Sequence, residues 1–522
     1  MPSEGPVEFS WHRPLLYGRQ PRLEHLGDVV LIVIDTLRAD FVGVYGGEVA
    51  TPNIDALAER GVLFRNAYSH IPITGPSHAS IFTSLLPVDH GVHNNGQVLE
   101  RDLESLPEVL FSWGWHTAGF VSLGVLKGGF GFDRGFDTYR DQFGVDWMKN
   151  AQELNREVYD WIERPPPGSI FLLLHYSDPH EPYTPPGLEY PRVRILFEGE
   201  ELAVLRADGR GVSVPVTVPP GRNALRFEAI TETPPRGVRF PTIRVVDSSL
   251  DLQLTAGWSE HDKRFGRSAF DTLLPSGAEL VNRSEDAVNT SLEVSCIERL
   301  SVAEIRQRYA QEVAFVDQQI GALMSRLDAA GRLDQTLLIF TSDHGEGLGD
   351  HDHVGHISQL YETLIRVPLI IVYPGRISTG VVIDDVVSLV DLAPTVVELL
   401  GLQLQTGVRG NSLVPLLRGG HMPERPVFAE THRPEAYSDK LAIISGGFKY
   451  IWSRRDHEWV ELYDLTEDPD EHRDLSQERP ELVSEMRDAL DRELASSQRF
   501  PAVEADISDE DAARLRALGY VH

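Results

Sequence analysis

The sequence is poor in cysteine and in long apolar runs. Cys296 is the single cysteine among 522 residues, which excludes an intrachain disulfide, and we interpret it as a buried thiol. No apolar run approaches the ~18 residues of a membrane-spanning helix. Residues 1–20 also lack the apolar core of a signal peptide. We therefore expect no membrane span and a cytoplasmic location, with export as the alternative.

Positive charge is also in deficit. The chain carries 48 Lys and Arg against 79 Asp and Glu, which gives a formal net charge of -31 at pH 7. This excess of negative charge repels phosphate backbones and anionic lipids, so it argues against nucleic acid and membrane partners. An anionic small molecule can still bind where metal ions reverse the local field. With 41% hydrophobic residues, the composition is that of a globular protein with one large domain and one or two smaller ones.

Apolar strands alternate with helices along much of the chain. Continuous apolar runs, typical of strands buried on both faces of a parallel sheet, cover residues 28–34, 169–175 and 336–341. Helical patterns cover residues 52–60 after Thr51 as N-cap, residues 76–84, and a long amphipathic segment after the capping box Ser301–Glu304. This alternation predicts an α/β sheet with helices on both faces and ligands at the carboxyl ends of its strands.

Metal-ligand side chains follow two of these strands. Asp35 comes directly after the first strand, and Asp343 and His344 come directly after a later one. Carboxylate oxygens and an imidazole nitrogen form a donor set that suits Zn, Mn, Mg or Ca. The three side chains therefore predict a divalent metal site at the sheet edge. His175, at the end of another strand, is interpreted as structural.

Residues 191–296 break the alternation of strands and helices. Their segments alternate apolar and polar residues between Pro- and Gly-containing turns, which predicts an inserted antiparallel β module. Two interpretations stay open for it: a structural insert that can also mediate a homo-oligomer, or a rim over the active site. The predicted organisation is an N-terminal lead (1–27), a catalytic domain (28–190 and 297–420), the β module (191–296) and a small C-terminal α+β subdomain (421–522).

Ordered motifs across the chain carry a resemblance to a known family. They include Asp35, Thr51-Pro52-Asn53-Ile54-Asp55, Thr74-Gly75-Pro76-Ser77-His78, Pro87-Val88-Asp89-His90-Gly91-Val92, His175-Tyr176-Ser177-Asp178-Pro179-His180-Glu181-Pro182-Tyr183 and Phe448-Lys449-Tyr450. On these motifs the chain resembles the sulfatase family of the alkaline phosphatase superfamily. The resemblance implies an alkaline-phosphatase-like mixed sheet flanked by helices, and an enzyme that hydrolyses ester bonds.

The resemblance also implies a role for each polar residue near the strand ends. Thr74 stands where sulfatases carry the Cys of Cys-x-Pro-Ser-Arg, so it takes the place of the nucleophile at a helix N-terminus. His180 matches a histidine that contacts the substrate oxyanion, and His356 falls where many sulfatases place a lysine on the leaving group. Asn95 matches an asparagine that binds a non-bridging oxygen in the phosphonate-hydrolase branch, or it stabilises a turn. His78 replaces the arginine and is placed with Asn95 among the substrate-binding residues. The implied metal ligands are Asp35, Asp343, His344 and Thr74.

The chain departs from the family at its nucleophile. Sulfatases convert Cys or Ser to formylglycine, whereas the extra methyl group of Thr74 would leave a ketone in place of the aldehyde. The Lys-x-x-His pair that grips the formylglycine hydrate is missing near residues 121–127, where only Lys127 could serve. Superfamily relatives with an unmodified Thr, such as the nucleotide pyrophosphatase/phosphodiesterase branch, use two metals. We therefore expect one or two divalent ions, the second held by Asp178, His180 and His356.

The unmodified Thr74 hydroxyl favours attack on phosphorus. The leading hypothesis is a metal-dependent hydrolase that cleaves phosphate mono- or diesters of a small anionic substrate through a covalent Thr74 intermediate. One alternative is a sulfatase, or a transferase that passes the phospho group to an alcohol. A further alternative is a non-catalytic binding protein with a decayed site, which the retained ligand residues oppose. The number of metal ions near Thr74 separates the phosphoester and sulfatase hypotheses.

Overall fold

The structure is a computed structural model that describes most of the chain. The described residues are 27–144, 147–208, 212–230, 238–240, 243–247, 249–258, 270–294, 296–298, 300–404, 407–433, 438–454, 458–497, 500–505, 508, 511 and 515. The predicted N-terminal lead, residues 1–27, lies outside the described residues except for Gly27.

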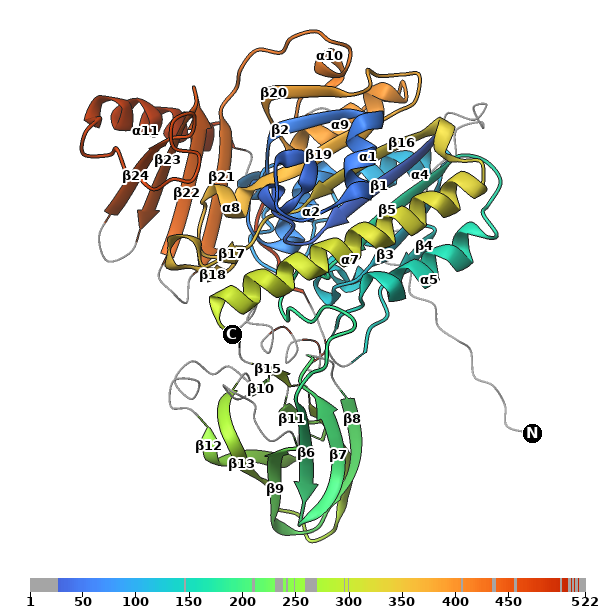
Figure 1. Cartoon of the computed structure of the whole chain (residues 1–522), viewed down its shortest axis with the longest axis vertical. Helices are drawn as coiled ribbons and strands as arrows, with labels where there is room; N and C mark the ends of the chain where they lie inside the picture. The colour runs from blue at the N-terminus through green and yellow to red at the C-terminus, as the bar shows by residue number, and fades with distance from the viewer. Residues whose placement is uncertain are drawn as a thin grey trace.

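An eight-stranded mixed sheet forms the centre of the main body (Figure 1). Its strand order is β20-β2-β19-β16-β1-β5-β3-β4. β1 pairs in parallel with both β16 and β5, whereas β19 is antiparallel to β16 and β2. The strands span Asp28–Ile34 (β1), Val62–Tyr68 (β2), His116–Val121 (β3), Thr138–Arg140 (β4), Ile170–Tyr176 (β5), Thr336–Ser342 (β16), Arg366–Val372 (β19) and Val381–Ser388 (β20).

Helices cover both faces of this sheet. All 7 residues of β1 are buried, and the apolar residues from Val29 to Ile34 alternate between two separate hydrophobic clusters. One cluster includes side chains of α2, α4 and α9, and the other includes side chains of α1, α5 and α7. Burial on both sides explains why the strand is apolar throughout, and it confirms the predicted α/β class. The helices span Pro52–Arg60 (α1), Thr74–Thr83 (α2), Leu106–Ser112 (α4), Ala151–Ile162 (α5), Val302–Ala329 (α7) and Leu392–Leu399 (α9).

The N-termini of α7 and α1 are capped in different ways. α7 opens with the predicted capping box, in which Ser301 N donates to Glu304 Oε2 at 2.8 Å. Thr51 precedes α1 as predicted but forms no capping bond. Instead its hydroxyl accepts a hydrogen bond from Gly43 N at 2.8 Å. The start of α1 is capped by a distant residue instead, because Asn53 N and Ile54 N donate to Asp317 Oδ1 of α7 at 3.0 and 2.9 Å.

A separate antiparallel β module occupies the chain between β5 and α7 and lies apart from the main body in Figure 1. Its strands form sheets of order β15-β10-β13-β9-β6-β7, with β12 beside β13, and β11-β14-β8. Side chains such as Val193 and Phe227 form its own hydrophobic cluster, which contains the buried thiol of Cys296, as predicted. The strands span Arg192–Phe197 (β6), Glu200–Arg206 (β7), Val212–Val218 (β8), Gly221–Ala229 (β9), Val238–Phe240 (β10), Ile243–Val245 (β11), Leu250–Trp258 (β12), Phe270–Asn282 (β13), Val288–Val294 (β14) and Ile297–Glu298 (β15).

A four-stranded antiparallel sheet follows the main body, with the order β21-β22-β23-β24. Helix α11 packs on it through Met486 and Leu490 (Figure 1). Neither here nor elsewhere in the described ranges does a helix combine the length and apolarity needed to cross a bilayer. These elements span Val427–Arg433 (β21), Ser438–Ser445 (β22), Phe448–Arg454 (β23), Glu458–Asp464 (β24) and Pro480–Ala495 (α11). Shorter elements span Pro87–His90 (α3), Glu362–Ile365 (α8), Val414–Leu417 (α10), Gly347–Leu348 (β17) and Val354–Gly355 (β18).

Candidate active site

The carboxyl ends of neighbouring parallel strands bring two carboxylates to one edge of the main sheet. In the β1–β16 pair, Ile34 lies opposite Ser342, so the next residues, Asp35 and Asp343, are neighbours. His344 lies with them, because its Nε2 is 3.7 Å from both Asp35 Oδ1 and Asp343 Oδ2. The structure therefore brings together the three metal-ligand side chains predicted at this edge.

Three atoms of this group are buried and have no hydrogen-bond partner: Asp35 Oδ1, Asp343 Oδ2 and His344 Nε2. All three side chains are fully buried, and their candidate ligand atoms lie within 4.8 Å of one another. An unpaired buried polar atom costs about 1–3 kcal/mol, so this group is unfavourable unless a ligand satisfies it. Two carboxylates and an imidazole are donors that a divalent cation accepts, and the residues fit such an ion.

The pKa shifts in this group also favour a bound cation. Burial raises the pKa of Asp35, but the contact with the His175 imidazole and the attraction of His180 outweigh burial and hold the pKa well below its usual range. Burial and the charge of Asp35 raise the pKa of Asp343 well above its usual range. Burial lowers the pKa of His344 to about 3, so this histidine is neutral, the form that binds metals. The repulsion between the buried carboxylates is the kind that a cation relieves.

Thr74 is the first residue of α2, which therefore begins earlier than the predicted start at Pro76. A proline in the first turn is tolerated, because N–H groups there have no partner within the helix. The Thr74 hydroxyl donates to Asp35 Oδ2 at 3.3 Å. Backbone N–H groups and the helix dipole favour an anion at this point, so Thr74 stands between an anion-binding helix end and the carboxylates.

Asn95 contacts the same helix end. Gly75 N donates to Asn95 Oδ1 at 2.7 Å, and a Cβ added at Gly75 would lie 2.8 Å from that oxygen. Glycine therefore permits the close approach. The Asn95 Nδ2 atom is buried without a partner, which leaves an amide donor available beside Thr74.

His78 and His175 form a second group of ligand atoms that shares Asp343. Their ring centroids are 4.9 Å apart. His78 Nδ1 lies 2.8 Å from the Thr74 carbonyl oxygen, and His175 Nε2 lies 3.4 Å from Asp35 Oδ2. The interpretation of His175 as purely structural misses this contact. The available signal was an imidazole at the same sheet edge as the two carboxylates, but only the structure shows that β5 is the strand beside β1.

His356 and His180 lie side by side with His344. The ring centroids are 4.8 Å apart for His344 and His356, and 4.9 Å apart for His356 and His180. His356 Nδ1 lies 3.3 Å from Glu346 Oε1. Burial lowers the pKa of His356, but the charge and hydrogen bond of Glu346 outweigh burial and raise it. The His356 Nε2 atom is buried without a partner, so this histidine can present a proton at the edge of the site.

Asp178 contacts the N-terminus of α5. Ala151 N, at the start of α5, donates to the two carboxylate oxygens of Asp178 at 2.8 and 3.1 Å. The carboxylate therefore accepts from a helix N-terminus, and the second metal site at Asp178, His180 and His356 stays a prediction. Within the described residues, the groups with ligand atoms this close are Asp35–Asp343–His344, His78–His175–Asp343 and His93–Glu430–His432.

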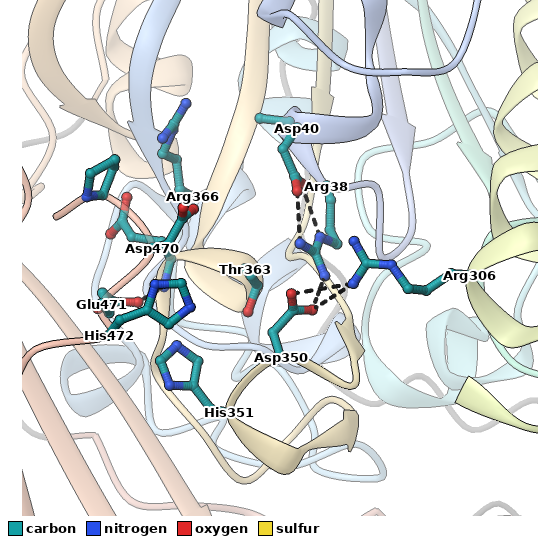
Figure 2. Close-up of a pocket in the computed structure, with 13 residues that line it drawn as sticks. Arg38, Asp40, Arg306, Asp350, His351, Thr363, Arg366, Asp470, Glu471 and His472 are labelled. Atoms are coloured by element: carbon teal, nitrogen blue, oxygen red, sulfur yellow. Dashed lines mark hydrogen bonds and ion pairs between the residues drawn. The ribbon is translucent and has the colours of Figure 1, made fainter. Parts of the chain in front are cut away.

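Arg38 and Lys127 lie outside these groups. Figure 2 shows Arg38 between Asp40 and Asp350, with which it forms ion pairs of 2.7 and 2.5 Å. These residues line a separate cavity of about 310 Å³. Lys127 Nζ pairs with Asp511 at 3.2 Å, so it does not replace the missing Lys-x-x-His pair.

A larger cavity of about 640 Å³ is lined by His180. Its wall also includes Lys149, just before α5, and Arg206 and Asp208 of the β module. The module thus contributes side chains to a cavity beside the site. This placement favours the interpretation of the insert as a rim.

One further histidine–carboxylate group joins the loop after α3 to strand β21. His93 Nδ1 lies 2.6 Å from Glu430 Oε1, and His432 Nε2 lies 3.4 Å from the same oxygen. His432 Nδ1 lies 3.1 Å from Asp439 Oδ1. Sequence reasoning missed this group, because His93 and Glu430 are 337 positions apart.

Known proteins match this chain over most of its length. The sulfatase family matches residues 27–402, and the family described as N-sulphoglucosamine sulphohydrolase, C-terminal, matches residues 350–499. An N-acetylglucosamine-6-O-sulfatase of Bacteroides thetaiotaomicron is 24% identical over 488 residues, which cover 85% of this chain and 81% of the relative. Arylsulfatase K of Homo sapiens is 25% identical over 506 residues, which cover 92% and 84%. The crystal structure of phosphonate monoester hydrolase of Agrobacterium radiobacter has a TM-score of 0.60 at 21% identity and covers 90% of this chain and 95% of that one.

Proposed function

The chain belongs to the sulfatase family of ester hydrolases, and we propose that it hydrolyses a sulfate or phosphate ester with the Thr74 hydroxyl as nucleophile. One observation carries the proposal. Thr74 opens a buried helix and donates to Asp35 inside a group whose remaining ligand atoms are unpaired. An oxygen nucleophile that lies between a helix N-terminus and a cation site is suited to accept a sulfuryl or phosphoryl group, because both features stabilise the negative charge of that group.

A divalent ion would be held by Asp35, Asp343 and His344, with Thr74 as a further ligand. When bound, such an ion supplies positive charge that favours the deprotonated form of a hydroxyl and neutralises a substrate oxyanion. The donor set accepts Zn, Mn, Mg or Ca.

Each residue around Thr74 would have its own role in the reaction. The Thr74 oxygen forms the new bond to sulfur or phosphorus while the bond to the departing alcohol breaks, and the Thr74 proton leaves to water. His356 donates a proton to the departing alcohol, for which its raised pKa suits it. His180 and the Asn95 amide bind the non-bridging oxygens of the transferred group. Water then cleaves the ester on Thr74 and restores the hydroxyl.

Sulfate esters are the first substrate class, because both curated relatives named above are sulfatases. Phosphate mono- and diesters are the second candidate, and Thr74 itself favours them. Its side chain cannot form the aldehyde on which the family's sulfate chemistry depends. The threonine at position 74 thus favours phosphate esters as substrates, whereas the two sulfatase relatives favour sulfate esters.

The alcohol part of the substrate would lie in the 640 Å³ cavity beside His180. Polar side chains such as Lys149, Arg206 and Asp208 line its wall and can bond to hydroxyl groups. A hydroxyl-rich, sugar-like alcohol fits this wall, in keeping with the amino-sugar sulfatase among the relatives.

Assays with matched variants test the proposal. The purified chain would be given 4-nitrophenyl sulfate, 4-nitrophenyl phosphate and bis(4-nitrophenyl) phosphate with Zn, Mn, Mg or Ca. We expect metal-dependent hydrolysis that Thr74→Ala abolishes and Thr83→Ala retains. Thr83 is the matched control, because it lies at the other end of the same buried helix and donates to Ala79 O at 2.7 Å.

The substrate that is cleaved fastest decides between the two ester classes. A preference for the sulfate ester supports the first candidate, and a preference for either phosphate ester supports the second. Hydrolysis that survives Thr74→Ala unchanged would overturn the assignment of the nucleophile.

A further inference from the structure

The two carboxylates at the strand ends stand between two sets of imidazoles. Asp35 Oδ1 lies 3.7 Å from His344 Nε2, whereas Asp35 Oδ2 lies 3.4 Å from His175 Nε2. Asp343 Oδ2 lies 3.7 Å from His344 Nε2 and also 3.7 Å from His78 Nδ1. Asp35 thus lies between His344 and His175, and Asp343 lies between His344 and His78.

His78 and His175 are fully buried but incompletely paired. The Nε2 atom of each has no hydrogen-bond partner. The other ring nitrogen is engaged, with the Thr74 carbonyl at 2.8 Å for His78 and with Ser122 Oγ at 3.3 Å for His175. When Nδ1–H donates to a carbonyl, Nε2 keeps its lone pair, which is the usual arrangement of a metal-binding histidine.

His90 shows that burial alone does not leave an imidazole unpaired in this protein. It is also fully buried, yet its Nε2 lies 3.0 Å from Ser80 Oγ. Its Nδ1 accepts a hydrogen bond from Val92 N at 3.1 Å. Unpaired Nε2 atoms also occur at His70 and His353, so the argument for a cation rests on the position of His78 and His175 beside Asp343 and Asp35.

We propose that His78, His175 and Asp343 hold a second divalent cation beside the one in the proposed function, on which this inference rests. Asp343 would be shared, and Asp35 offers one oxygen to each side. The candidate ligand atoms of the new group lie within 4.8 Å of one another, a spacing that metal–ligand bonds of about 2.0–2.2 Å can close with small shifts. Two imidazoles with one carboxylate favour Zn over Ca or Mg.

The second cation would stand on the side of the nucleophile. The Thr74 hydroxyl donates to Asp35 Oδ2, which is the oxygen that faces His175. The departure from the family motif at position 78 also acquires a reason. Arginine has no lone pair to offer a cation, whereas the neutral imidazole of His78 keeps one on a ring nitrogen.

Metal content tests the second site without relying on activity. After exposure to Zn²⁺ and removal of loosely bound ions, the wild-type chain should retain about two zinc ions, as in two-metal sites. His175→Gln and His78→Gln should each retain about one, and His90→Gln, the matched buried control, about two. With Ca²⁺ alone the wild type should retain about one ion, because the imidazole pair disfavours calcium. Anomalous diffraction from zinc-loaded wild-type crystals should show two peaks about 3.5–4 Å apart.

The possible outcomes separate this inference from the proposed function. A wild type that retains one zinc ion, or a folded His175→Gln that retains two, overturns the second site. If hydrolysis still depends on Thr74 in that case, the proposed function stands. A chain that binds no ion and keeps its activity in Thr74→Ala would remove both. If the histidine variants do not fold, the number of anomalous peaks in the wild type decides.

Discussion

Among the described residues, two clusters of three or more residues combine histidine with carboxylate, and in one of them every member has an unpaired atom. The α2 cluster consists of Asp35, His78, His175, Asp343 and His344, each with one buried atom that has no hydrogen-bond partner. The β21 cluster consists of His93, Glu430 and His432, where one Glu430 oxygen lies within 3.4 Å of both imidazoles. The same chemical groups thus satisfy themselves in one region and require a ligand in the other.

Protonation accounts for the difference between the clusters. Burial lowers the pKa of His78 to about 3, so it is neutral and keeps a lone pair. Burial also lowers the pKa of His432, but Glu430 and Asp439 outweigh burial and raise it to about 9. Burial raises the pKa of Glu430, but its bonds with His432 and His93 outweigh burial and lower it to about 2. Proximity of histidine and carboxylate is therefore insufficient evidence for a metal, because a proton can take the place of the cation.

Replacement of Thr74 should give the largest difference in kcat between a variant at the α2 cluster and a variant in the β21 cluster. Thr74→Ala should lower kcat by a factor of about 10⁴ or more, because the covalent step is lost. Glu430→Gln, in the β21 cluster, should leave kcat near the wild-type value. Steady-state kinetics on the preferred ester measure both, and comparable losses in the two variants would contradict a catalytic role confined to the α2 cluster.

Proton donation at the edge of the α2 cluster should depend on the leaving group. His356→Gln should lower kcat by about 10²–10⁴ for an alkyl ester, whose alcohol departs only with a proton. The loss should be much smaller for the 4-nitrophenyl ester, because nitrophenolate departs without one. Rates over a series of leaving groups test this, and an equal loss across the series would show that His356 does not donate the proton.

Metal binding should stabilise the protein through the α2 cluster. At a zinc concentration of 100 times the Kd of the Asp35–Asp343–His344 site, binding at that site should add about 2.7 kcal/mol to the free energy of unfolding in the wild type and in His432→Gln. Asp35→Asn should lose this contribution and keep only the contribution of the second site. Calorimetric unfolding with and without zinc gives the comparison, and a gain that disappears in His432→Gln would place the ion in the β21 cluster.

The β21 cluster should make stability depend on pH in the alkaline range. Because the folded pKa of His432 is raised to about 9, its contribution is fully present below the ordinary pKa of about 6.5 and is lost as pH rises through about 9. The free energy of unfolding should fall by an amount on the order of 2 kcal/mol across this window. His432→Gln should flatten the fall, whereas the exposed control His421→Gln should retain it. A fall that persists unchanged in His432→Gln would assign it to other groups.

Local patterns are sufficient to find part of the fold and of the site. A buried strand that ends in a polar residue identifies Asp35 and Asp343, and the capping box at Ser301 marks the start of α7. Thr74 follows from its motif, although the helix begins earlier than the pattern around Pro76 suggests. These features depend on residues within a few positions of one another, which explains why a single sequence reveals them.

The remainder of the site depends on contacts that are distant in sequence. The contact of His175 with Asp35 depends on β5 lying beside β1, and strand order is not encoded in local periodicity. The carboxylate of Asp178 accepts a hydrogen bond from Ala151 N at the start of α5, a contact that the sequence around Asp178 does not reveal. The β21 cluster brings together His93 and Glu430, which are 337 positions apart in the sequence. Such contacts arise from packing, so a single sequence cannot supply them.

Mass spectrometry of acid-quenched enzyme tests most directly whether Thr74 is the nucleophile. In wild-type enzyme quenched during the first turnover, the peptide that contains Thr74 should carry one sulfuryl or phosphoryl group on that residue. The same peptide from Thr74→Ala should carry none. Product formed in the first turnover without any modification of Thr74, or with the group on another residue, would contradict covalent catalysis by this threonine.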